Sequence, residues 1–325
     1  MKHIFLIHSN TVLLSALGAI EYEGIPRKDI LFLYSRHFSS TIVDNDIQVI
    51  DISDMFDLSN ERDFVYNYSK HSKIIRLADQ LICNFTKDKY IAYVPHFTLP
   101  IFTVFISNRQ CIATCLLQEG AFSFFGKPTE KVKTWVKNAL FSSNRIWWLT
   151  TWDMPKRWEK HIKLKKTYAI DTAFFSPLCA ENIIIKWPHI DNEKLIFPEN
   201  TNFFIFESAV EQSFLSIEQY VECCNKLIED SGVTKCYLKF HPAQTEAHKK
   251  EIEKLFDNID YELFDNSIPF ELVLCSSKNL NLYGFSTSLL KFGKNLGHHV
   301  TSYLDMMCSA SPKFKTHIEQ GNYSI

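Results

Sequence analysis

Glycine is scarce in this sequence, with only 9 among 325 residues, which leaves little room for a glycine-rich phosphate loop. The 9 cysteines form no C-x-x-C pair and their number is odd, so disulfides and a zinc site are not expected. No long hydrophobic run exists: the run after Lys2 is interrupted at His8, and residues 91–107 contain Pro95 and Pro100. We therefore expect a cytoplasmic chain in a reducing compartment, with peripheral contact at the inner membrane left open.

The sequence also lacks an excess of charge of one sign, since 35 basic residues face 37 acidic ones and the formal net charge is −2. A near-neutral chain has no overall field with which to hold nucleic acid, so no nucleic-acid partner is expected. The hydrophobic share of 46% is enough for a real core and excludes disorder as the main theme. At roughly 150 residues per domain, the length suggests two domains.

Short apolar runs alternate with helix-length periodic segments, which is typical of βα units and parallel sheets. In the first half we predict strands at His3–His8, Asp29–Tyr34, Ile47–Ile52, Tyr90–Val94, Cys111–Leu117 and Ile146–Thr150. Helices are predicted at Thr11–Glu23, Glu61–Asn84, Phe97–Arg109 and Thr129–Leu140. After Thr151 the density of prolines favours a connecting region, at Pro155, Pro177, Pro188 and Pro198.

A second alternating series follows, so we predict an α/β chain of two Rossmann-like domains, residues 1–190 and 191–325, facing across a cleft as in the GT-B glycosyltransferase fold. Strands are predicted at Phe203–Phe206, Lys235–Phe240, Tyr261–Phe264, Asn281–Tyr283 and His299–Tyr303. Helices are predicted at Ser216–Asp230, Gln244–Phe256, Pro269–Ser276 and Ser286–Asn295.

Polar residues follow several of these strands, at the edge where ligands gather in open α/β sheets. Glu119 can act as a general base or be a surface turn residue, and His241 can meet a phosphate or be an ordinary turn histidine. Gly284, Ser286 and Thr287 open a helix, a pattern that suits a phosphate site but equally suits plain capping.

Other polar features have two readings each. Glu271, in the first turn after Pro269, either compensates the helix dipole or accepts hydrogen bonds from a ribose. Asp44-Asn45-Asp46 has the D-x-D form of metal-dependent sugar transferases, yet it lies in a polar turn where such residues are common. The histidines other than His241 show no metal-ligand spacing, so we interpret them as structural or surface groups and expect no metal site.

The order of these signals resembles the bacterial sialyltransferases of GT-B fold, of the lipooligosaccharide type. An acidic-Gly step at 119–120 is followed by K-x-H-P at 239–242, by P-x-E at 269–271 and by a Ser/Thr pair at 286–287. The stretch 261–288 is the most specific part, and the opening strand with Ser9-Asn10-Thr11 is similar too. The resemblance follows the motif order over most of the chain.

The resemblance implies a role for each matching position. Glu119 would deprotonate the acceptor hydroxyl, and His241 would contact the CMP phosphate and assist its departure. The other matches would bind the nucleotide (Lys239, Pro242, Glu271, Ser286 and Thr287) or lie on the acceptor side (Ser9, Asn10 and Gln118). The chain departs from the family at Gln118, where a second acid is usual, and at Thr287, where serine is usual.

The resemblance thus implies an inverting, metal-independent transfer of sialic acid or a related nonulosonic acid from its CMP donor. The acceptor would be a hydroxyl of an oligosaccharide or lipid-linked glycan in bacterial surface polysaccharide synthesis. No cofactor is expected, because hydroxyls, amides and one histidine can stabilise a single phosphate. Two alternatives stay open: a GT-B transferase that uses a UDP- or GDP-sugar, and a non-catalytic nucleotide-sugar-binding partner.

Overall fold

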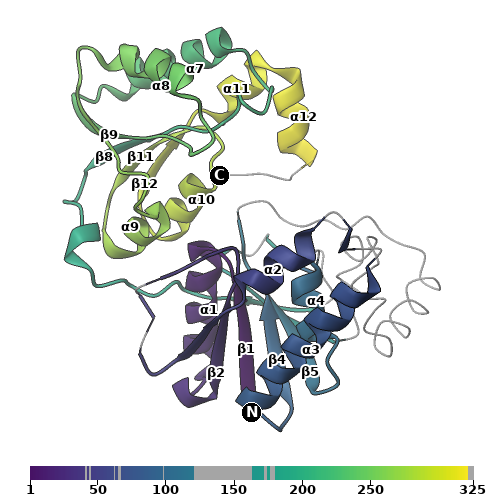
Figure 1. Ribbon diagram of the computed structural model, residues 1–325. Helices are drawn as coiled ribbons and strands as arrows, with labels where there is room; N and C mark the ends of the chain where they lie inside the picture. The colour runs from purple at the N-terminus through teal and green to yellow at the C-terminus, as the bar shows by residue number, and fades with distance from the viewer. Residues whose placement is uncertain are drawn as a thin grey trace. The chain divides into compact units, whose positions relative to one another are not determined.

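The computed structural model describes residues 1–320 except 41, 44, 62, 65–66, 98, 121–162, 172–173 and 176–179. These residues form two compact units (Figure 1), one that runs to Glu119 and resumes with the described residues up to Pro188, and one that contains His189 onward. The helix predicted at 129–140, the strand predicted at 146–150 and the first aspartate of the D-x-D triplet lie outside the described residues.

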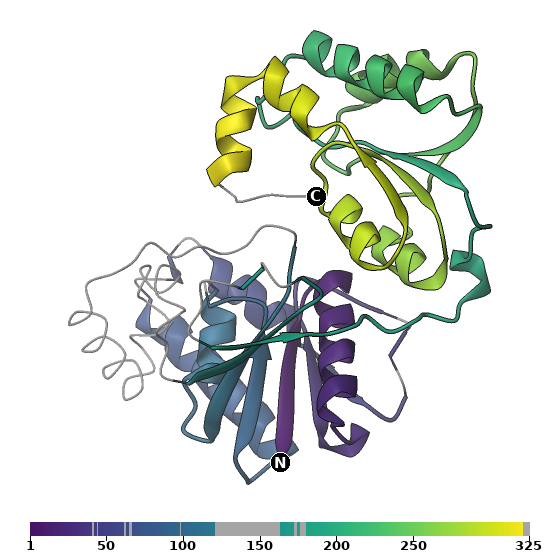
Figure 2. The same cartoon turned by 180° about the vertical axis from the view of Figure 1, so that it is seen from behind.

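The first unit holds a parallel sheet whose described strands have the order β3-β2-β1-β4-β5-β6-β7. Helices α2, α3 and α4 cover one face, and α1 covers the other (Figures 1 and 2). The strands are β1 Lys2–Ile7, β2 Ile30–Tyr34, β3 Gln48–Asp51, β4 Tyr90–Val94, β5 Cys111–Leu117, β6 Leu164–Ala169 and β7 Glu181–Ile184. The helices are α1 Asn10–Glu23, the 3₁₀ turn Arg27–Asp29, α2 Ser53–Asn60, α3 Tyr68–Phe85 and α4 Pro100–Ile106.

Local signals in the sequence fix where these helices begin and end. The Ser9 hydroxyl accepts the Val12 N–H and starts α1, which ends at Gly24 with a left-handed φ of 63°. The Asn67 side chain accepts the Lys70 N–H and starts α3 in the same way. The single helix predicted over 61–84 is therefore wrong at its start, because this cap separates α3 from α2.

The connecting region predicted after Thr151 is also wrong, since it contains two strands of the first sheet. β6 pairs with β5, and β7 pairs with β6, both in parallel. Pro188 and Pro198 follow β7 and interrupt neither strand, while the two earlier prolines lie outside the described residues. Pro188 and Pro198 thus come after β6 and β7 and do not prevent these two strands from forming.

The second unit holds a parallel sheet whose described strands have the order β10-β9-β8-β11-β12. Helices α7, α8, α11 and α12 pack on one face, and α9 and α10 lie on the other (Figures 1 and 2). The strands are β8 Asn202–Ile205, β9 Lys235–Lys239, β10 Asp260–Leu263, β11 Asn281–Gly284 and β12 His299–Ser302. The helices are α7 Ile217–Ser231, α8 Glu246–Glu253, α9 Phe270–Ser276, α10 Ser288–Asn295, α11 Leu304–Ala310 and α12 Pro312–Gln320, with 3₁₀ turns at Glu193–Leu195 and Lys254–Phe256.

Two details of this unit correct the sequence-based predictions. Gly284 is the last residue of β11 rather than part of a turn. Helix α10 begins at Ser288, because Thr287 is its cap and accepts the Leu289 N–H. Capping is therefore one role of Thr287. The closing pair of helices, α11 and α12, was not predicted.

The prediction of an α/β chain with two Rossmann-like halves is confirmed, and in each sheet the strand order reverses beside the first strand of the unit. The reversal falls between β1 and β4 in the first sheet and between β8 and β11 in the second. Such switch points are where open α/β sheets bind ligands. Within the described part of the chain, no helix is long and apolar enough to span a membrane.

Candidate functional site

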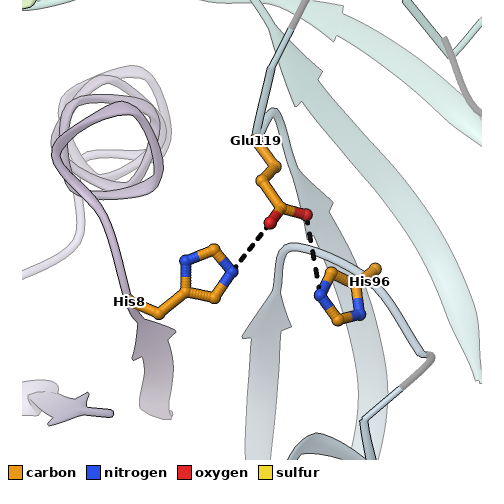
Figure 3. A group of neighbouring side chains, drawn as sticks. All are labelled: His8, His96 and Glu119. Atoms are coloured by element: carbon orange, nitrogen blue, oxygen red, sulfur yellow. Dashed lines mark ion pairs between the residues drawn. The ribbon is translucent and has the colours of Figure 1, made fainter. Parts of the chain in front are cut away.

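Three polar side chains meet at the switch point of the first sheet (Figure 3). His8 directly follows β1, His96 lies two residues after β4, and Glu119 lies two residues after β5. These strands are neighbours in the order β1-β4-β5, so their carboxyl ends bring the three side chains together. We call His8, His96 and Glu119 the first-sheet cluster.

The two histidines flank the carboxylate of Glu119. Nε2 of His8 lies 3.0 Å from Oε1, and Nε2 of His96 lies 3.6 Å from Oε2. The side chains of the histidines are 1% and 6% exposed, whereas that of Glu119 is 25% exposed. Both ring nitrogens of His8 are buried without an aligned hydrogen bond to any described residue, despite the short contact with Glu119. The cluster therefore keeps polar capacity for a ligand.

The surroundings of the cluster hold Glu119 in its ionised form. Burial raises the pKa of this carboxyl, but the contact with His8 and the charges of His96 and Arg36 outweigh it, so the pKa is lowered overall. Burial lowers the pKa of His96 to about 4, against the attraction of Glu119. At neutral pH the cluster thus combines a carboxylate with a neutral His96 ring, an arrangement suited to accepting a proton.

The same three groups form a donor set for a metal ion. One ligand atom from each lies within 4.8 Å of the others. Two neutral imidazoles and a carboxylate are ligands that Zn²⁺ and other divalent transition metals bind. The cluster can therefore serve as a base or hold a metal, and geometry alone permits both.

The acceptor-side candidates lie close to this cluster in sequence but serve the fold. Ser9 caps α1 and Asn10 is its first residue. Gln118 is fully buried, and its side-chain oxygen accepts the Ile170 N–H at 2.9 Å while its backbone oxygen accepts the Ser15 hydroxyl. The amide at 118, where the family usually has an acid, thus ties β5 to the start of the segment after β6.

A second candidate site lies at the switch point of the second sheet. Glu207, His241 and Ser286 each lie two residues after a strand, and these strands are neighbours in the order β9-β8-β11. All three residues line one depression, which we call the second-sheet pocket. Residues of the second unit that line it are Glu207, Ser208, Ala209, Gln212, Phe214, His241, Ser286, Thr287, Ser288, Phe314, His317 and Ile318.

The ring of His241 is oriented by its own turn. Its Nδ1 accepts the Ala243 N–H at 3.1 Å, and its backbone N–H donates to the Gln244 side-chain oxygen at 2.7 Å. A neutral ring that accepts at Nδ1 carries its proton on Nε2. Burial and the charge of Lys239 lower the pKa of His241. His241 is therefore set up to donate from Nε2 to an anion in the pocket.

Glu207 is the residue that sequence reasoning missed in this pocket. Its carboxylate accepts the Ser286 N–H at 3.2 Å and also the Ser286 hydroxyl in a short contact. Burial raises the pKa of Glu207 to about 7, against these two hydrogen bonds. A carboxylate thus occupies the donors at the end of β11 that were predicted to meet a phosphate.

The remaining nucleotide-binding candidates are not among the lining residues of this pocket. Lys239 is buried, and its Nζ donates to the Phe240 carbonyl at 2.9 Å and to the Asn266 side chain at 2.6 Å. Burial lowers the pKa of Lys239, and the charge of Glu271, in the first turn of α9, opposes this. Pro242 is exposed in the turn after β9. The structure therefore gathers His241, Ser286 and Thr287 in one pocket, whereas Lys239, Pro242 and Glu271 do not line it.

No protein-family model and no curated protein matches the chain. Solved structures share its fold. The GT-B domain of a sialyltransferase from Photobacterium damselae superposes with a TM-score of 0.54 and 14% identity, over 99% of this chain and 97% of that one. A UDP-GlcNAc 2-epimerase from Methanocaldococcus jannaschii superposes with a TM-score of 0.52 and 10% identity, over 95% of this chain and 91% of that one. At these identities the likeness is one of fold, and the chain has the GT-B type of architecture.

Proposed function

We propose that this chain is a glycosyltransferase that moves a nonulosonic acid, such as sialic acid, from its CMP donor to a glycan hydroxyl. The observation that carries the proposal is the chemistry of the second-sheet pocket. It offers hydroxyls, a helix start and two histidines, His241 and His317, and among its described lining residues there is a carboxylate but no lysine or arginine. Such a lining suits the single phosphate of a CMP-sugar better than the larger charge of a diphosphate.

In the proposed reaction Glu119 takes the proton of the acceptor hydroxyl as its oxygen attacks the anomeric carbon. The bond from that carbon to the phosphate oxygen breaks, and CMP leaves with inversion at the sugar. Nε2–H of His241 donates to the departing phosphate. Ser286 and Thr287 bind the phosphate, and Lys239, Pro242 and Glu271 contribute to the nucleotide side.

On the acceptor side, Ser9, Asn10 and Gln118 shape the surroundings of Glu119 through the caps and hydrogen bonds of α1 and β5. The acceptor is proposed to be an oligosaccharide or lipid-linked glycan of a bacterial surface polysaccharide. Nucleotide binding is assigned to the domain 191–325 and acceptor binding to the domain 1–190. The transfer reaction is proposed to occur in the cytoplasm, and peripheral contact with the inner membrane would give access to lipid-linked acceptors.

A donor competition experiment tests the proposal against its alternatives. CMP should bind the purified chain where UDP and GDP do not, and binding of UDP or GDP alone would favour the other GT-B donors. Slow hydrolysis of a CMP-nonulosonic acid without acceptor should be accelerated by the chain. A chain that binds CMP-sugars but leaves their hydrolysis rate unchanged would be the non-catalytic binding partner.

The donor set of the first-sheet cluster makes metal dependence a specific alternative, and we propose that transfer needs no divalent cation. Activity should survive EDTA, and added Mg²⁺, Mn²⁺ or Zn²⁺ should not increase it. Metal analysis of the purified protein accompanies the assay. If activity is lost with EDTA and restored by one of these ions, His8, His96 and Glu119 would be the ligands of a metal ion, and Glu119 would not be the general base.

A further inference from the structure

Glu207 stands where the donor's phosphate is proposed to bind. Its two carboxylate oxygens accept the Ser286 N–H and the Ser286 hydroxyl. Those two donors are the ones that a phosphate at this helix start would use. Glu207 and Ser286 each lie two residues after neighbouring strands, β8 and β11, and both line the second-sheet pocket, so Glu207 lies beside the proposed phosphate position. A carboxylate already on these donors must lose its charge or its contacts before an anion can bind.

No described cation compensates Glu207, because no ion pair joins it to a lysine, arginine or histidine and its Ser286 contacts are neutral donors. Its electrostatic neighbours are Tyr220 and Cys224 of α7 and Cys308 of α11, and His241 and His317 line the same pocket. Glu211, in the following turn, bonds to Thr245 and His248 instead. Burial with no counter-charge raises the pKa of Glu207 to about 7, so the proton is available near neutral pH.

We propose that the donor binds together with a proton, which Glu207 takes up from solvent. The charged carboxylate becomes a carboxylic acid, gives up its hold on the Ser286 N–H and hydroxyl, and turns its own O–H toward a phosphate oxygen. One negative charge leaves the pocket as the phosphate enters it. The inference rests on the proposed function for the identity of the donor, but it makes a separate statement about how that donor is bound.

The test is a calorimetric titration of the full chain with the methyl ester of CMP. This phosphodiester keeps one negative charge across the pH range, whereas the phosphate of CMP itself, a monoester, would titrate near pH 6. Binding is measured from about pH 6 to pH 9, and at pH 8 in two buffers of different ionisation enthalpy. Glu207→Gln is the test variant, since it keeps the shape and one acceptor. Glu211→Gln is the control, because Glu211 bonds to His248 and Thr245 instead of Ser286.

The wild-type chain and Glu211→Gln should bind the ester about a hundredfold more weakly at pH 9 than at pH 6, and should take up close to one proton on binding at pH 8. Glu207→Gln should show less than about a threefold change over that range and almost no uptake. Binding by the wild-type chain without proton uptake would overturn the inference. An unchanged pH dependence in Glu207→Gln would also overturn it, and would assign the proton uptake to His241. Absence of CMP ester binding at every pH would instead reject the proposed donor.

Discussion

At the scale of single residues, Glu119 is the proposed base, because it stands at a strand end, is partly buried and contacts two histidines. Replacing it with glutamine keeps the size of the side chain but removes its ability to take a proton. We expect transfer by Glu119→Gln to fall by roughly 10²–10⁴, the usual worth of a positioned general base. CMP affinity and melting temperature should hardly change. A well-folded variant with near-normal turnover would remove Glu119 from the mechanism.

His8 is the residue whose removal should be visible in the pH profile. Its contact helps to keep the pKa of Glu119 low, while burial alone would raise it. Activity needs ionised Glu119, so it is lost as the pH falls through that pKa. In His8→Phe the pKa of Glu119 should rise, and activity at pH 5 relative to pH 8 should drop below that of wild type.

The matched variant is His8→Gln, which keeps an N–H donor at a similar reach and should retain more of the wild-type acid limb. Rates are followed from pH 4 to pH 9, with circular dichroism to confirm folding. An acid limb that is identical in all three proteins would show that His8 only fills space.

The sequence could predict Glu119, His241, Ser286 and Thr287 as candidates, because each stands in a short local motif at a strand end. His8, His96 and Glu207 could not be found in this way. Each becomes a site neighbour only through the order of strands in a parallel sheet, which places residues far apart in sequence side by side. All three are polar residues that follow strands, but nothing in the neighbouring sequence distinguishes them from other polar residues at strand ends.

At the scale of elements, apolar runs and caps located most strands and helices of the Rossmann-like halves to within a few residues. The predictions failed where the local sequence pattern did not reflect how an element packs in the folded chain. β6 begins with Leu164, Lys165 and Lys166, a polar start that conceals a strand which is buried only in its second half. The sequence does not announce the cap at Asn67, because apolar and aromatic residues stand on both sides of it, Phe64 to Tyr66 before and Tyr68 after, as they would inside a helix.

Gly284 shows how an element boundary positions the pocket. It pairs with Ile205 across the β8–β11 ladder, and a Cβ at this position would lie 2.7 Å from the Ile205 carbonyl oxygen. Gly284→Ala should therefore push the two strands apart and destabilise the chain by about 1–3 kcal/mol. Because Ser286 lies two residues further on, CMP affinity should fall in the same variant.

The comparison for this variant is Gly293→Ala in α10, measured by thermal unfolding and CMP titration. There the added Cβ meets the end of the Leu282 side chain, which can turn away more easily than backbone. Gly293→Ala should be the milder change in both measurements. Equal effects of the two substitutions, or an unaltered melting temperature in Gly284→Ala, would contradict the argument from close backbone approach.

At the scale of the whole molecule, the GT-B architecture is shared by transferases and by a sugar epimerase, so the fold does not select the reaction. The selection comes from the two switch points. One gathers a carboxylate between two histidines, and the other gathers hydroxyls, two histidines and a second carboxylate. We propose that the second-sheet pocket is the one that binds CMP.

A hydrogen-exchange footprint of CMP on the full chain, with UDP as the comparison, tests that claim most directly. Saturating CMP should slow exchange in the peptides that contain 239–244, 269–272 and 284–288, and UDP at the same concentration should not. All of these segments follow residue 190. Protection centred before residue 190, or protection by UDP in place of CMP, would contradict the account.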